Sequence, residues 1–276
     1  MDVKKRVDVL DHGFVELIDY MGSDQRVVDA ARVSVSGDEV KPVSTNEGLI
    51  RYLMRHKHST PSEMPQFTFA IKMPILTMRQ LVRHRTASIN EMSARYSVLP
   101  DEFYIPDLER LNVQAKNNHQ GSDPEVIADA KTVQEKLKAH AKLSYELYMD
   151  LLDTGLAREL ARNVLPVSIY TQIYWTIDLR NLFHFLALRR DGHAQHEIRV
   201  FAEAIWEIIQ PLFPQSCKAW EDYVYNAATF SSEELLIIKQ LFGFGLEDGL
   251  YEMLDDSSLS KREKREFLGK LGLGDL

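Results

Sequence analysis

Alternation of apolar and other side chains predicts two strands that each bury one face. In residues 67–73 that face consists of Phe67, Phe69, Ile71 and Met73. In residues 167–177 the positions on one face are apolar or β-branched: Val167, Ile169, Thr171, Ile173, Trp175 and Ile177. The apolar-rich run 14–22, which ends in Gly22, predicts a third strand.

Other segments have the three-to-four-residue spacing of amphipathic helices. Ser44 and Glu47 form a capping-box pattern at the start of one, and Asp178 is suited to cap another. The serine-rich residues 86–97 are predicted to be a loop. The predicted helices are residues 23–34, 44–58, 74–85, 123–155, 157–166, 179–190 and 193–213, with shorter ones beyond residue 230. Together the elements predict a helix-rich α+β fold.

The charge balance bears on what the protein binds. The 276 residues contain 33 Lys and Arg against 41 Asp and Glu, which gives a formal net charge of -8. An acidic chain repels polyanions, so nucleic-acid binding is disfavoured. The uncharged run 163–177 is too short and too polar to span a bilayer, and the N-terminus lacks the apolar core of a signal peptide. We therefore expect a cytoplasmic protein with no membrane contact.

Several common chemistries lack their sequence patterns. The single cysteine, Cys217, has no base beside it and is expected to be a packed core residue. His193 and His196 could share a helix face, but no four-ligand metal spacing is present, and no metal site is predicted. The glycines of residues 243–249 do not have the spacing of a dinucleotide-binding loop. Any nucleotide must therefore be held by side chains.

An arginine cluster in residues 83–97 is the most unusual feature of the chain. Arg83, Arg85 and Arg95 lie there with a single acid, Glu91. A solvated face, a nucleic-acid contact and a pocket for a small anion are all possible explanations, and the acidic background favours the small anion. On a helix, Arg83 and Arg85 would point about 200° apart. Two phosphate-bearing ligands, or one ligand shared with a neighbouring subunit, would use both.

Arg83-His84-Arg85, followed after seven residues by Ser93, resembles the signature of the flavin-dependent thymidylate synthases. The segments GFVELIDYMG, AARVS, RHKHSTPSE, EFYIP, ARNVLP and LRRDGHAQHEI resemble family segments in the same order, from about residue 7 to about residue 225. The resemblance implies a single helix-rich domain, residues 1–230, with a mixed or antiparallel sheet flanked by helices. Residues 231–276 would be a helical C-terminal extension.

The resemblance implies synthesis of dTMP from dUMP. FAD would be the cofactor, methylenetetrahydrofolate the carbon donor and NADPH the reductant. It also implies a homotetramer with active sites shared between subunits. A non-catalytic nucleotide- or flavin-binding protein on the same fold is the alternative.

The resemblance also assigns residues to each ligand. The predicted FAD contacts are Thr60, Arg83, His84, Arg85, Glu91, Asp178, Leu179, Arg180 and His184. The predicted dUMP contacts are Gln80, Leu81, Val82, Arg83, Glu91, Met92, Ser93, Ala94, Arg95, Arg162 and Arg189. Arg189 is predicted to be the catalytic residue that polarises the uracil ring. His58 and His193 resemble pocket histidines near the flavin.

Two residues depart from the family pattern. Ala94 stands where the family has Gly, so the approach of a phosphate to the backbone is more crowded. Asp178 stands where the family has Asn, and a carboxylate cannot donate a hydrogen bond as an amide does.

Overall fold

The structure is a computed structural model that describes residues 6–34, 45–116, 121–242, 247–271 and residue 273. It divides into two compact units, Met1–Tyr225 and Asn226–Leu276. None of the helices in these described ranges is long and apolar enough to cross a membrane.

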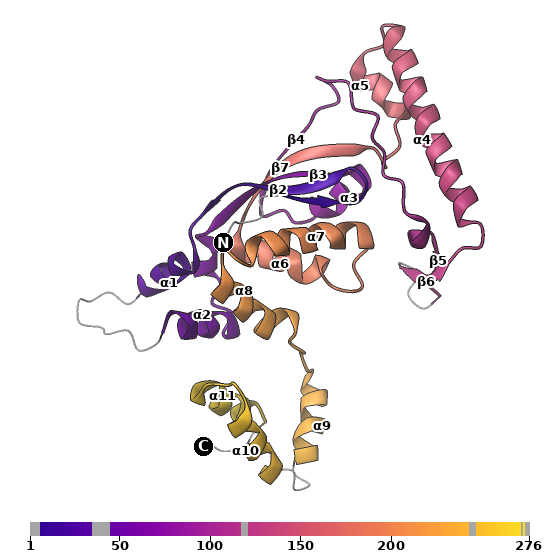
Figure 1. Cartoon of the computed structure of the whole chain (residues 1–276). Coiled ribbons are helices and arrows are strands. Elements are labelled where there is room, and N and C mark those ends of the chain that lie inside the picture. Colours follow the sequence, from indigo (N-terminus) through magenta and orange to yellow (C-terminus); the bar gives the residue numbers. More distant parts are fainter. Residues whose placement is uncertain (1–5, 35–44, 117–120, 243–246, 272, 274–276) are drawn as a thin grey trace. The chain divides into compact units, whose positions relative to one another are not determined.

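A five-stranded sheet forms the centre of the first unit (Figure 1). Its order is β1-β2-β3-β7-β4, and every pair of neighbours is antiparallel. The register pairs Phe69 with Trp175 and Ile71 with Ile173, which brings the two predicted alternating faces together. The strands are β1 (Arg6–Val9), β2 (Gly13–Met21), β3 (Gln66–Pro74), β7 (Tyr170–Asp178) and β4 (Ser88–Glu91).

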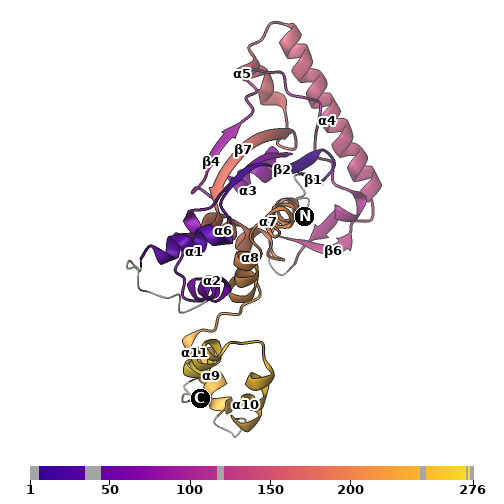
Figure 2. The same ribbon diagram turned by 60° about the vertical axis from the view of Figure 1, so that its left-hand side comes forward.

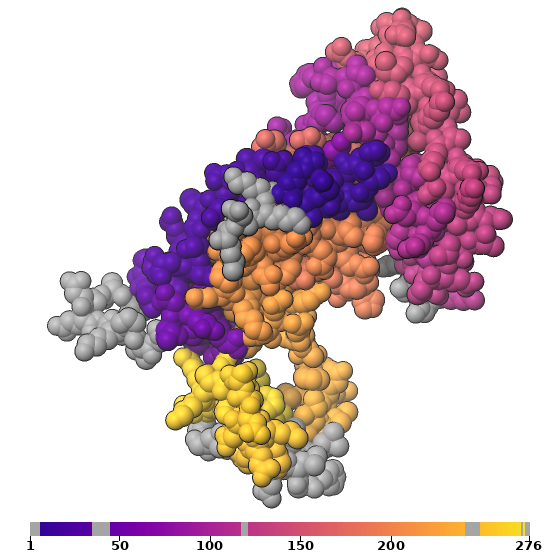
Figure 3. Space-filling view, in the orientation of Figure 1, coloured from indigo at the N-terminus to yellow at the C-terminus, as the bar shows by residue number. Residues whose placement is uncertain are grey.

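Helices α6 (Leu179–Arg189) and α7 (His196–Ile209) cover one face of this sheet (Figures 1 and 2). The ring of Phe185 on α6 lies 5.2 Å from that of Trp175 on β7, and both side chains are buried. In the space-filling view the N-terminal strands lie directly against these helices (Figure 3). This core fixes the end of β7, and with it the start of α6, where several of the predicted site residues lie.

Four further helices of the first unit contribute buried residues to this core: α1 (Asp24–Arg32), α2 (Asn46–Arg55), α3 (Ile75–Leu81) and α8 (Pro214–Trp220). The other elements are β5 (Asn112–Gln114), β6 (Ser122–Val126), α4 (Ala130–Asp153) and α5 (Arg158–Ala161). Ala141 of α4 belongs to a second, smaller buried cluster with Leu99, Phe103 and Ile169. Short 3-10 helices span Thr60–Glu63, Leu108–Arg110 and Arg162–Val164, and a π-helical turn spans Glu221–Tyr225.

The predicted α+β class, three strands and the Asp178 cap are confirmed, and the cap bonds the backbone N–H of Asn181 at 2.9 Å. Val167 is 59% exposed and does not join the buried face of β7. Thr45, rather than Ser44, caps α2 by accepting from the Gly48 N–H, and Ser44 lies outside the described residues.

Two predicted boundaries are wrong in ways that matter for the site. The helix predicted over 74–85 ends at Leu81, and the loop predicted over 86–97 contains β4, which pairs with β7. The helix predicted from residue 123 begins at Ala130, because residues 122–126 pair with β5 instead.

In its described residues the second unit contains the helices α9 (Ser232–Phe242), α10 (Glu247–Asp256) and α11 (Lys261–Leu271). Leu254, Leu268 and Leu271 are buried within it. Glu263 and Ser260 form a reciprocal capping box at the start of α11. The short helices predicted beyond residue 230 are thus confirmed.

Candidate active site

Residues 83–86 form one wall of a cleft of about 280 Å³ at the end of β7. We call it the RHR cleft; its lining residues are Arg83, His84, Arg85, Thr86, Ile177, Asn181, His184, Leu188 and Arg189. Its opposite wall is α6, whose first residues follow β7 directly. The structure therefore brings predicted flavin residues and the predicted catalytic arginine into one cleft.

Arg189 is held in this cleft by neutral acceptors. Its Nε atom donates to Nε2 of His84 at 3.1 Å, and its Nη2 atom donates to the backbone carbonyl of Gln80 at 3.4 Å. Burial, the charge of Arg189 and the nearby His184 lower the pKa of His84 to about 4. His84 is thus neutral near pH 7 and can accept this hydrogen bond, so Arg189 keeps its positive charge with no carboxylate partner in the described part of the chain.

Arg83 and Arg85 are exposed, and neither forms an ion pair with any residue of the described ranges. Both lie beyond the end of α3, so the predicted helical separation of about 200° does not apply to them. Unpaired guanidinium groups in an acidic protein are suited to bind phosphate.

Glu91 to Ala94 line a second cleft, of about 300 Å³. We call it the serine cleft; it is lined by Ile75, Glu91, Met92, Ser93, Ala94, Leu99, Arg162, Leu165, Val167, Ile169, Tyr170 and Thr171. Glu91 is fixed by a hydrogen bond of 2.8 Å from the buried hydroxyl of Thr171. Ser93 Oγ accepts from the backbone N–H of Arg95 at 3.2 Å.

Two arginines at the serine cleft differ in their partners. Arg95 pairs with Glu159 at 3.1 Å. Arg162, in the 3-10 helix after α5, is exposed and has no acidic partner among the residues the structure describes. Of the two, Arg162 is the freer group for an anionic ligand.

A third, more apolar cleft of about 380 Å³ is bordered by Arg180, His184 and His58. Arg180 pairs with Glu63 at 2.8 Å, and Thr60 begins the same short helix as Glu63. Both carboxylate oxygens of Asp178 are occupied by Asn181, which donates from its backbone N–H and its side-chain amide. His193 is exposed and bonds Asp191 rather than lining any of the three clefts.

Three predicted contact residues are buried. Leu81 and Leu179 are 0% exposed, and Ala94 is 8% exposed. The side chains of Leu81 and Leu179 belong to the core, so only the backbone of these two residues is available to a ligand. Val82 is partly buried and packs against the same core.

One chain does not bring all predicted dUMP contacts together. Thr171 borders the serine cleft, and Ile177, six positions further along β7, borders the RHR cleft. At the rise of a strand, this is about 20 Å, which exceeds the length of a mononucleotide. Arg162 and Arg189 of the same chain therefore border separate clefts.

A group of polar residues that hydrogen-bond to the Gln80 side chain was not predicted from the sequence. Gln80 Nε2 donates to Gln195 Oε1 at 2.6 Å, and Gln195 in turn donates to the buried carboxylate of Glu197 at 2.6 Å. The signal for this group was present, because Glu197 shares a helical face with the apolar Phe201 and Ala204 of α7. An acid on a buried face needs polar partners.

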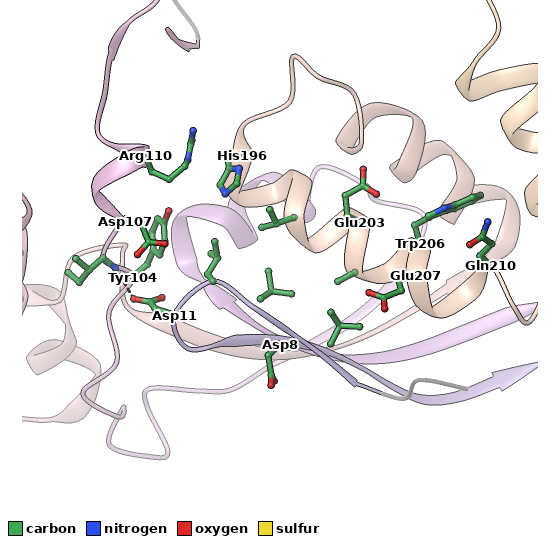
Figure 4. A pocket seen from close by; sticks show the side chains of 16 residues that line it. Asp8, Asp11, Tyr104, Asp107, Arg110, His196, Glu203, Trp206, Glu207 and Gln210 are labelled. Carbon is green, nitrogen blue, oxygen red and sulfur yellow. Dashed lines mark hydrogen bonds between the residues drawn. The ribbon is translucent and has the colours of Figure 1, made fainter. Parts of the chain in front are cut away.

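A further cavity, of about 840 Å³, is lined by residues of β1, of the segment 104–110 and of α7 (Figure 4). None of the predicted site residues lines it. Within the described part of the chain, no group of three or more His, Cys, Asp or Glu residues could hold a metal ion.

Comparison with known proteins gives a consistent result. Residues 16–215 match the family described as Thymidylate synthase complementing protein. A flavin-dependent thymidylate synthase of Ehrlichia ruminantium (strain Gardel) is 46% identical over 268 residues, which cover 97% of this chain and 88% of the relative. One from Gluconobacter oxydans (strain 621H) is 47% identical over 268 residues, covering 96% of this chain and 86% of that protein.

A solved structure is also similar. The UMP/dUMP methylase PolB from Streptomyces cacaoi, bound with 5-Br dUMP, superposes with a TM-score of 0.70 at 38% identity. The match covers 79% of this chain and 99% of PolB. With the signature residues Arg83 to Arg85 gathered in one cleft and a family match over most of its length, the chain belongs to the family of flavin-dependent thymidylate synthases.

Proposed function

We propose that this protein makes dTMP by methylating dUMP with FAD as its cofactor. The observation that carries the proposal is a set of arginines, Arg83, Arg85 and Arg162, that have no carboxylate partner among the residues the structure describes, together with Arg189 held by neutral His84. In a chain of net charge -8, such groups are suited to anionic nucleotides.

dUMP is proposed to bind with its phosphate at Arg162 and Arg95, beside Ser93 and Ala94. PolB, which is 38% identical, was solved with 5-Br dUMP bound, which supports a dUMP site in this chain. Arg95 must exchange its contact with Glu159 for the phosphate, whereas Arg162 has no ion pair with a described residue to break. Glu91 and Met92 of the same chain, and Gln80 of the subunit that provides Arg189, are proposed to contact the rest of the nucleotide.

FAD is proposed to bind along the RHR cleft. The exposed guanidinium groups of Arg83 and Arg85 fit its pyrophosphate, and Thr60, His84, Arg180 and His184 would contact the remainder. Asp178 would act through the turn that it caps, because Asn181 already occupies both of its carboxylate oxygens. The flavin, when bound, supplies the electrons that reduce the transferred one-carbon unit.

Arg189 is proposed to act on the uracil ring. A fixed positive charge beside the ring favours ionisation at N3 and stabilises negative charge that develops on the carbonyl oxygens. His84 and the Gln80 carbonyl hold the guanidinium in place without neutralising it. The charge is therefore in position before the substrate binds.

A second copy of the chain is proposed to complete each active site. Because the two clefts of one chain lie about 20 Å apart along β7, a nucleotide in the serine cleft would meet Arg189 of a neighbouring subunit. A homotetramer provides such neighbours.

The other partners are proposed on the family resemblance. Methylenetetrahydrofolate would supply the carbon and NADPH the reducing equivalents, and the reaction would take place in the cytoplasm.

Anaerobic spectroscopy of the purified protein tests the proposed function. We expect protein with FAD to lose its absorbance near 450 nm on addition of NADPH (about 450 nm being the usual flavin band). We also expect release of tritium from dUMP labelled at C5 when methylenetetrahydrofolate is present. Flavin and dUMP binding without tritium release would indicate the non-catalytic alternative, and failure to bind FAD would contradict the proposed synthesis of dTMP.

A further inference from the structure

Glu197 is a buried carboxylate with no role in the proposed reaction. It lies in the first turn of α7 and is 6% exposed. Gln195 donates to its Oε2 atom at 2.6 Å, Tyr104 donates to its Oε1 atom at 2.9 Å, and Arg110 lies 3.6 Å from Oε1. Figure 4 shows Tyr104 and Arg110 extending toward the start of α7, where His196 begins the helix.

Glu197 is ionised despite its burial. Burial by itself raises the pKa of a carboxyl group, but hydrogen bonds from Gln195, from its own backbone and from Tyr104, with the charge of Arg110, hold the pKa of Glu197 below its usual value. An ionised carboxylate can only accept hydrogen bonds. The direction of each bond to Glu197 is therefore fixed.

The charge of Glu197 therefore also fixes the orientation of the Gln195 and Gln80 amides. Because Glu197 only accepts, Gln195 must present its NH₂ group to Glu197 and its carbonyl oxygen to Gln80. Gln80 must then donate its own NH₂ group to Gln195, at 2.6 Å. The remaining polar atom of that amide is Oε1 of Gln80, which accepts no hydrogen bond from any residue in the described ranges.

We infer that Glu197 is a positioning residue which, through Gln195, sets the amide of Gln80 so that its carbonyl oxygen faces the nucleotide. The inference rests on the proposed function, in which Gln80 contacts dUMP. An oxygen at this position accepts from the 3′-hydroxyl of the sugar, because N3 of the uracil, where Arg189 is proposed to favour ionisation, then has no hydrogen to donate. If the Gln80 amide were turned the other way, it would present its NH₂ group, a donor, to the nucleotide instead of its carbonyl oxygen.

The main test is the dissociation constant for dUMP, measured by calorimetry with FAD-loaded protein. Glu197→Gln replaces the carboxylate with an amide, which can donate or accept. The direction of the hydrogen bonds from Gln80 to Gln195 and from Gln195 to residue 197 is then no longer fixed. We expect a rise of roughly three- to tenfold in the dissociation constant. Gln195→Met removes the exposed amide that links Glu197 to Gln80 and leaves the buried charge unchanged. The same rise in the dissociation constant for dUMP is expected.

An exchange of the two residues separates direction from charge. In Glu197→Gln with Gln195→Glu, the new carboxylate at 195 can only accept from Gln80, so the direction is restored. We expect this double variant to bind dUMP to within about twofold of the wild type. Arg110 and Tyr104 lose their carboxylate in this variant as they do in Glu197→Gln, so a merely structural role predicts no rescue.

Controls and analogues complete the test. Glu203→Gln alters an exposed acid on the same helix that pairs with Arg190, and it should leave dUMP binding unchanged. An analogue that lacks the 3′-hydroxyl tests the donor: it should bind the wild type and Glu197→Gln equally, whereas an analogue methylated at N3 should still bind the two proteins differently.

Unchanged dUMP binding in Glu197→Gln and Gln195→Met, or a double variant no better than Glu197→Gln, would overturn the inference while leaving the proposed function intact. Wild-type protein that binds no dUMP would overturn both.

Discussion

In the RHR cleft, Arg189 is partly buried and hydrogen-bonded to two neutral acceptors, whereas Arg162 in the serine cleft is exposed and, among described residues, has no acidic partner. The first arrangement fixes a charge in place, as required for a charge that must act on a reacting ring. The second leaves a long side chain free to close on a ligand. The difference separates a proposed catalytic arginine from a proposed binding one.

Arg189→Ala should have the largest effect, because it removes the fixed charge from the proposed reaction. We expect the turnover number to fall roughly 100- to 1,000-fold, measured as tritium release from labelled dUMP. Arg79→Ala, an exposed arginine on α3, is the matched control and should retain wild-type turnover. Turnover within threefold of the wild type would remove Arg189 from the mechanism.

Arg162→Ala should mainly weaken binding. Loss of a hydrogen bond to a charged phosphate is expected to raise KM for dUMP about 10- to 100-fold, with a smaller change in kcat. Steady-state kinetics over a range of dUMP concentrations measures both constants. A fall in kcat with an unchanged KM would mean that the two arginines do not divide their roles as proposed.

Because His84 is neutral in the folded protein, the stability of the protein should fall in acid. In the unfolded chain a histidine takes up a proton near pH 6.5, but in the folded protein the pKa of His84 is lowered to about 4. Between these values the unfolded state binds more protons, so stability falls as the pH drops from about 6.5 toward 4. Melting temperatures should therefore decline less over this range in His84→Gln than in the wild type. Parallel declines would show that His84 is not neutral in the folded protein.

Thr171→Val should have the smallest effect. It removes the hydrogen bond to Glu91 in the serine cleft, and we expect KM for dUMP to rise about two- to fivefold. The matched control is Thr176→Val on the same strand, whose hydroxyl bonds Thr68 and which lines neither cleft. Equal effects of the two substitutions would argue that Glu91 is not positioned by Thr171.

Much of the fold was predictable because β3, β7 and α6 have a clear hydrophobic period. The end of α3 at Leu81 and the pairing of β4 with β7 were not, since most of residues 82–91 are polar and the choice of partner strand depends on contacts distant in sequence. The candidate site residues came from the family resemblance, and their assignments to ligands remain predictions. Glu197 was overlooked because a single acid within an apolar helix face gives no indication of its partners.

The central claim is that one subunit provides the serine cleft and another provides Arg189 for each active site. Mixing Arg162→Ala and Arg189→Ala proteins, after dissociation and reassembly, tests this directly by tritium release. If sites are shared, each mixed interface contains one intact site, and we predict recovery of about a quarter of wild-type activity from two weakly active parents. If both arginines serve the same chain's site, no mixed oligomer contains an intact site. Activity no higher than that of the parents, with mixed oligomers shown to have formed, would contradict the sharing of active sites between subunits.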